Sequence, residues 1–97
     1  GSGPAYIFHM VEAMAEAGGK LGLEPEMAMA FARATVAGAG EMLHRSELPA
    51  AKLRQNVTSP GGTTEAALKV LMGDDGLSRL MEAAMAAARD RSRELGS

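Results

Sequence analysis

Residues 28–40 constrain the fold of this 97-residue chain more than any other stretch. Within them only Arg33 and Thr35 are neither apolar nor glycine, and a helix that is apolar nearly all round must be covered on most of its faces. One chain of this length has little material to cover it. We therefore expect a long central helix, from about residue 25 to residue 44, at the centre of an intertwined homodimer. The alternative is the central helix of a monomeric bundle.

Small residues form a stripe along this central segment. Ala30, Ala34 and Gly38 recur at a spacing of four, which brings them onto one helix face and permits the close approach of another helix. The apolar run is short for a membrane span and contains Arg33, so we expect no membrane partner. The stripe instead favours packing against a second protein helix.

Apolar residues recur at helical spacing on both sides of the central helix, so the sequence predicts an all-α domain of about five helices. Gly18 and Gly19 are expected to end the first helix, and Pro60 the third. The faces expected to point inward consist of Ile7, Met10, Val11, Met14 and Ala17; Leu53 and Val57; Ala67, Leu68, Leu71 and Met72; and Leu77, Leu80, Met81, Ala84, Met85 and Ala88.

Composition excludes several functional classes. A net charge of −2 and 3% aromatic residues provide neither the positive surface nor the stacking side chains of a nucleic-acid-binding protein. The chain has no cysteine and no pattern typical of a signal peptide, so we expect a soluble cytoplasmic protein without disulfides. His9, Glu12 and His44 do not supply the roughly four ligands of a structural metal site, so no metal is expected.

A polar turn at residues 56–64 interrupts the helical segments and is the place where chemistry is expected. Gly61 and Gly62 permit backbone angles that other residues avoid, and they let the main chain approach a ligand closely. Thr63 or Thr64 is expected to be the N-cap of the following helix. A loop that leads into a helix N-terminus suits a carboxylate or phosphate, because the free N–H groups and the helix dipole attract anions.

The polar turn also permits a simpler interpretation. Hydroxyl groups of Ser59, Thr63 and Thr64 would line an anion site, but the same residues are also typical of an ordinary connection between two helices. It is not a Walker-type phosphate loop, since no lysine follows the glycines and no apolar strand precedes them.

Three parts of the sequence resemble pyrroline-5-carboxylate reductase. Residues 56–64 followed by Ala67 and Leu68 resemble the signature of that family, residues 1–6 are similar to the entry into its second domain, and residues 91–95 resemble the end of its chain. The resemblance therefore covers essentially all of residues 1–97 and implies the C-terminal helical dimerisation and substrate-binding domain. The family's N-terminal dinucleotide-binding domain is expected to be absent, because residues 38–40 lie in a helical run rather than between a strand and a helix.

The resemblance also implies an activity and a site. The whole enzyme is expected to reduce the cyclic imine 1-pyrroline-5-carboxylate to L-proline with NADPH or NADH, whereas these residues alone bind no cofactor and are inactive. The substrate carboxylate is expected to contact the N–H groups of Gly62, Thr63 and Thr64 and the hydroxyl of Ser59, with Gly61 shaping the turn. Thr64 is the candidate catalytic residue, through a hydrogen bond to the ring nitrogen.

Other functions remain open for this sequence. The chain is expected to associate with itself as a homodimer, with higher assembly left open. It is either a substrate-binding domain, a helical assembly module without a ligand, or a domain that binds another small carboxylate or phosphate at the same turn.

Overall fold

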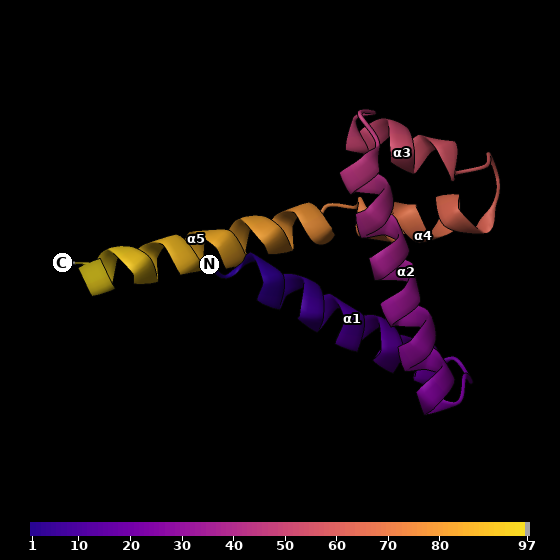
Figure 1. The fold of residues 1–97 in the computed structure, drawn as a ribbon, viewed down its shortest axis with the longest axis horizontal. Helices are drawn as coiled ribbons and strands as arrows, with labels where there is room; N and C mark the ends of the chain where they lie inside the picture. The colour runs from indigo at the N-terminus through magenta and orange to yellow at the C-terminus, as the bar shows by residue number, and fades with distance from the viewer. Residues whose placement is uncertain (97) are drawn as a thin grey trace. The chain divides into compact units, whose positions relative to one another are not determined.

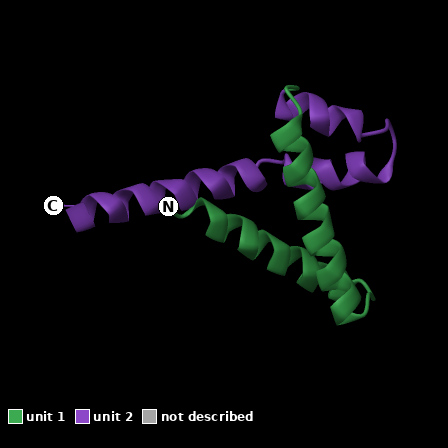
Figure 2. Ribbon diagram, viewed as in Figure 1, with its two compact units in different colours: residues 1–48 green, residues 49–97 purple. Residues whose placement is uncertain are grey.

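The structure is a computed structural model that describes residues 1–96, and within them it contains helices and no strand. The helices are α1 (Gly3–Lys20), α2 (Pro25–Arg45), α3 (Ala50–Asn56), α4 (Thr63–Leu71) and α5 (Leu77–Gly96) (Figure 1). The predicted all-α fold with about five helices and a long second helix is therefore confirmed. The chain divides into two compact units, one containing α1 and α2 and the other beginning at Pro49 (Figure 2).

In the first unit α1 and α2 pack against each other as a helical hairpin. A Cβ atom added to Gly18 would lie 3.3 Å from the Cβ of Ala28, so the two backbones approach closely beside the connection. Ala28 and Ala32, one turn apart on α2, are the only buried apolar residues in the described part of the chain. The core of a single chain is therefore restricted to small side chains in this hairpin.

The end of α1 differs from the sequence prediction. The helix continues through Gly18 and Gly19 to Lys20. Gly22, with a φ of 109°, provides the left-handed residue that ends it. The N–H of Gly22 bonds to the carbonyl of Gly19 at 3.1 Å, and the N–H of Leu23 bonds to that of Gly18 at 3.0 Å. This is the hydrogen-bond pattern of a Schellman motif, which satisfies the last carbonyl groups of the helix.

The end of α3 also differs from the prediction. The helix ends at Asn56, four residues before Pro60. Beyond it the N–H of Thr58 bonds to the carbonyl of Gln55 at 3.1 Å, and the hydroxyl of Thr58 donates a hydrogen bond of 2.6 Å to the carbonyl of Arg54. Leu53 is half-buried as expected. Val57 does not point inward as predicted: it lies beyond the helix and its side chain is 64% exposed.

The connection between α4 and α5 depends on a glycine. The N–H of Gly76 donates to the carbonyl of Gly73 at 2.9 Å, and a Cβ atom at Gly76 would lie 2.2 Å from the carbonyl oxygen of Leu71. No side chain fits at that distance, so glycine is required for this turn.

Most of the apolar faces that the sequence predicts are uncovered in the single chain. Phe31 and Met42 on α2 are each 55% exposed, and Leu80 on α5 is 63% exposed. The same is true of further residues on the predicted faces, namely Ile7, Met14, Leu71, Met72, Leu77 and Met85. Ala30, Ala34 and Gly38 are exposed too. Within residues 1–96, no helix has both the length and the apolar character that a membrane crossing requires.

Candidate functional site

The polar turn is built on a β-turn from Ser59 to Gly62. The N–H of Gly62 donates to the carbonyl of Ser59 at 3.0 Å, Pro60 occupies the second position, and Gly61 occupies the third with a φ of 72°. Proline at the second position and a residue with positive φ at the third are typical of a type II turn. Of the two glycines, Gly61 therefore adopts a backbone conformation that other residues avoid.

The cap of α4 differs from the prediction. Gly62, not a threonine, is the N-cap, and no side chain caps the helix. Thr63 and Thr64 are its first two residues, and the first carbonyl used by the helix is that of Gly62, which accepts from Ala66 at 3.2 Å. Glycine fits here because a Cβ atom at Gly62 would lie 3.2 Å from the carbonyl oxygen of Ser59.

The backbone donors of the turn are not equally available. The N–H of Gly62 is engaged by Ser59, and the N–H of Gly61 donates to Oε1 of Glu65 at 3.3 Å. The N–H groups of Thr63 and Thr64 lie in the first turn of α4, where no preceding carbonyl of the helix reaches them. The N–H groups of the two threonines are therefore available as donors at the start of α4.

The side chains of the turn differ in their exposure. Ser59 and Thr63 are exposed, whereas Thr64 and Glu65 are half-buried. The structure thus brings the hydroxyl-bearing residues Ser59, Thr63 and Thr64 to one end of α4, beside the two glycines.

Glu65 is a residue of this turn that the sequence analysis did not identify. It stands three residues after the cap Gly62, where a glutamate can reach back to backbone N–H groups ahead of its helix. A glutamate three residues after a helix cap is the sequence signal that could have identified Glu65. Glu65 also lines an open groove of about 320 Å³ between α3 and α4, together with Arg54, Thr58, Leu68 and Lys69.

The described residues do not fit a dinucleotide. Residues 38–40, a Gly-Ala-Gly sequence, lie inside α2, whereas the turn that binds a dinucleotide pyrophosphate joins a strand to a helix. Nor does any group of three or more histidine and acidic side chains in residues 1–96 have a geometry that would hold a metal ion. Nδ1 of His9 lies 3.2 Å from Oε1 of Glu12, as an exposed pair on α1.

Comparison with known proteins agrees with this fold. Residues 1–95 match the model of a family described as pyrroline-5-carboxylate reductase dimerisation. A pyrroline-5-carboxylate reductase from Pseudomonas aeruginosa is 50% identical over 95 residues, which are 98% of this chain and 34% of that protein. The protein of the same name from Staphylococcus aureus strain COL is 45% identical over 97 residues, all of this chain and 35% of that protein.

Solved structures agree as well. A Plasmodium falciparum pyrroline carboxylate reductase with NADP bound has a TM-score of 0.91 at 33% identity, over 99% of this chain and 36% of that one. A Coxiella burnetii pyrroline-5-carboxylate reductase has a TM-score of 0.91 at 49% identity, over 98% of this chain and 35% of that one. The chain spans about a third of the length of these relatives. The resemblance noted in the sequence is confirmed: the chain belongs to the pyrroline-5-carboxylate reductase dimerisation family.

Proposed function

We propose that residues 1–97 are the dimerisation and substrate-binding domain of a pyrroline-5-carboxylate reductase, and that the chain forms a homodimer. The observation that supports self-association most directly is the lack of a core, since only Ala28 and Ala32 are buried among the described apolar residues. Phe8 is 69% exposed and Phe31 is 55% exposed. Covering one such side chain stabilises a protein by about 1.5–3 kcal/mol. A second copy would provide that cover.

The proposed reaction reduces the C=N bond of 1-pyrroline-5-carboxylate to give L-proline. NADPH or NADH supplies the hydride, and because these residues do not fit a dinucleotide, the nicotinamide would be bound outside this chain. What this chain contributes is a position for the substrate. Fixing a substrate in the reacting geometry can lower a barrier by several kcal/mol. The cytoplasmic location expected from the sequence stays a prediction.

The polar turn is the proposed substrate-binding site. The substrate carboxylate would accept hydrogen bonds from the N–H groups of Thr63 and Thr64 and from the hydroxyl of Ser59, at the positive end of the α4 dipole. Gly61 gives the turn its left-handed residue, and Gly62 leaves the approach to α4 free of a side chain. The sequence analysis also expected the N–H of Gly62 to contact the carboxylate. That N–H is not included in the proposed site, because it already bonds to the carbonyl of Ser59.

Thr64 is the proposed catalytic residue. Its side chain is half-buried at the start of α4, where a hydroxyl can bond to the ring nitrogen while its own N–H contacts the carboxylate. A threonine hydroxyl is a poor acid, so its role would be to orient the ring and to relay a proton from water to the nitrogen as the C=N bond is reduced.

An NMR titration with proline tests the site. The helix dipole and a few hydrogen bonds each contribute about 1 kcal/mol, against several kcal/mol for ordering the ligand, so binding should be about millimolar or weaker. We expect the amide signals of Thr63 and Thr64 to shift most. Thr64→Val should preserve the shifts caused by the carboxylate, and Gly62→Val should abolish them.

Thr35→Val, the same change on α2, is the matched control and should leave the titration unaltered. If saturating proline moves no signal in the turn while the chain remains a folded dimer, the chain is an assembly module and the substrate site is refuted. Equal shifts with succinate or phosphate would indicate a site for small anions in general.

A further inference from the structure

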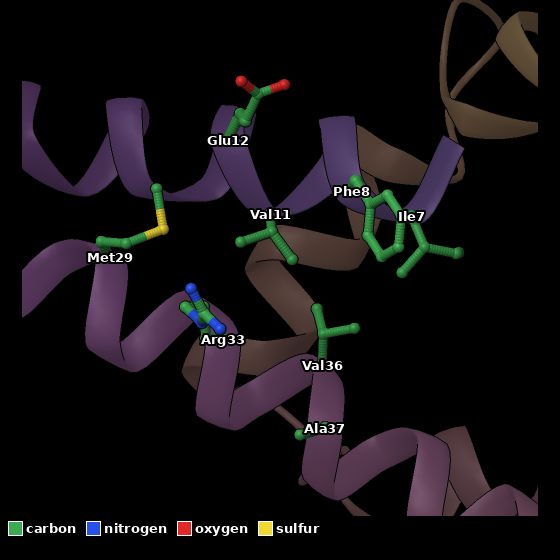
Figure 3. Close-up of a pocket in the computed structure, with 8 residues that line it drawn as sticks. All are labelled: Ile7, Phe8, Val11, Glu12, Met29, Arg33, Val36 and Ala37. Carbon is green, nitrogen blue, oxygen red and sulfur yellow. The ribbon is translucent and has the colours of Figure 1, made fainter. Parts of the chain in front are cut away.

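The groove between α3 and α4 differs in its chemistry from the groove between α1 and α2. The α1–α2 groove, about 610 Å³ in volume, is lined mainly by apolar side chains such as Ile7 and Phe8 (Figure 3). The smaller α3–α4 groove contains the charged side chains of Arg54, Glu65 and Lys69. It lies beside the polar turn, because Glu65 stands in the first turn of α4.

The carboxylate of Glu65 holds a backbone group and not a cation. Arg54 and Lys69 line the same groove, yet within residues 1–96 neither forms an ion pair with Glu65. Oε1 of Glu65 instead accepts a hydrogen bond of 3.3 Å from the N–H of Gly61. Glu65 is half-buried, whereas both cations are exposed to water. The carboxylate therefore acts on the polar turn.

This contact determines which backbone donors are left for a ligand. Within residues 60–62, the proline has no N–H and the N–H of the second glycine bonds inside the turn at 3.0 Å. The remaining N–H is that of Gly61, and it would compete with those of Thr63 and Thr64 for a substrate carboxylate. Because Glu65 engages it, the carboxylate has donors at the start of α4 alone within this stretch.

The same contact joins the turn to the helix. Gly61 precedes the cap of α4, and Glu65 is the third residue of the helix, so their hydrogen bond spans the point where the chain enters it. A hydrogen bond to an ionised acceptor is stronger than one between neutral groups. Groups that are held in place before a ligand arrives lose less freedom when it binds. The N–H groups of Thr63 and Thr64 are therefore positioned in advance.

We propose that Glu65 is a positioning residue of the substrate site. By holding the N–H of Gly61, it directs the carboxylate of the cyclic imino acid to Thr63 and Thr64, and it keeps the hydroxyl of Thr64 in place for the ring nitrogen. Glu65 acts through the turn and does not touch the substrate. The role belongs to its acceptor oxygen, so a glutamine should perform it and an apolar side chain should not. This inference rests on the proposed function and deepens it.

An NMR titration with proline tests the proposal on two variants. Glu65→Leu removes the acceptor but keeps a side chain in the groove, and the dissociation constant for proline should rise about threefold to tenfold, as expected for the loss of one hydrogen bond. The Gly61 amide signal, which should change little in the wild type, should now shift on titration, because its freed N–H becomes a donor for the carboxylate. Glu65→Gln retains the acceptor oxygen and should restore the wild-type dissociation constant within about twofold, together with the wild-type behaviour of Gly61.

Glu26→Leu is the matched control. Glu26 is the acidic residue in the first turn of α2 and is exposed, so the change removes the same charge from a helix N-terminus and should leave the affinity for proline within about twofold. A merely structural role of Glu65 would lower the free energy of unfolding in Glu65→Leu without creating a response at Gly61, and that result would overturn the proposal. So would a Glu65→Gln variant that binds proline as weakly as Glu65→Leu.

The outcome is distinguishable from a failure of the site itself. A wild-type chain in which proline moves no signal of the turn refutes the substrate site and this inference with it. A wild type that responds, beside a Glu65→Leu variant with the same affinity, refutes only the role of Glu65. If Glu65→Leu does not fold, hydrogen exchange of the wild-type Gly61 amide decides the question. Exchange slower than in an unstructured peptide supports the contact, and exchange at the unstructured rate overturns it.

Discussion

At the scale of single residues, Gly61 determines whether the polar turn can form. Its φ of 72° lies in the left-handed region, which costs an L-residue with a Cβ about 1–2 kcal/mol. Gly61→Ala should therefore lower the free energy of unfolding by about that amount in urea denaturation at fixed protein concentration. Gly61→Asn is the matched control and should cost less, because asparagine tolerates this conformation. Equal stability of the alanine variant and the wild type would contradict the assignment.

The sequence indicated the turn but not how its hydrogen bonds are distributed. Pro60 and Gly61 mark a turn because of their backbone restrictions, and these are local properties. The choice between Gly62 and a threonine as N-cap differs by only a few tenths of a kcal/mol, so the surrounding backbone decides it. The contact from Glu65 to Gly61 likewise depends on where the turn places an N–H group, which residue types do not reveal.

At the scale of helices, the small-residue stripe on α2 should be part of the dimer interface. A Cβ atom at Gly38 would meet nothing within 4 Å in the single chain, so Gly38→Leu is compatible with an isolated α2. If another helix packs there, the added side chain overpacks the interface and costs about 1–3 kcal/mol, or roughly tenfold or more in dimer affinity. Sedimentation equilibrium measures this loss.

Ala13→Leu is the matched control for the stripe. Ala13 is exposed and shares a face of α1 with His9 and Glu16, so the same added bulk should leave the dimer unchanged. A Gly38→Leu dimer as tight as the wild type would exclude the stripe from the interface.

Helix periodicity predicted every helix, and the ends were less predictable. Apolar spacing indicated α1 and α5 because one face of each helix repeats the same residue types over many turns. The ends depend on a few local hydrogen bonds and backbone angles. Gly22 and not Gly18 ends α1, and α3 ends at Asn56 and not at Pro60. For that reason Val57, assigned to a buried face, lies outside its helix.

At the scale of the whole molecule, these residues should have no reductase activity by themselves. Their glycine pairs lie within helices or in the helix-to-helix turn, and no strand of the described chain leads into a pyrophosphate-binding turn. We expect no oxidation of NADPH or NADH in the presence of pyrroline-5-carboxylate, followed by absorbance at saturating substrate. A full-length relative is the positive control. Turnover by the pure chain would contradict the absence of a dinucleotide site.

The sequence and the structure of one chain say least about which surface covers its apolar residues. The run at residues 28–40 shows that cover is needed, and the exposure of Phe31 and Met42 shows that one chain does not provide it. Which surface provides it depends on a second molecule.

The mass of the particle in solution tests the central claim most directly. Light scattering after size exclusion, at micromolar concentration, should give twice the chain mass of 10.0 kDa, because the exposed faces of α1, α2 and α5 need a second copy to cover them. The mass should stay at this value on dilution through the micromolar range. A stable, cooperatively folding particle with the mass of one chain would contradict the dimer.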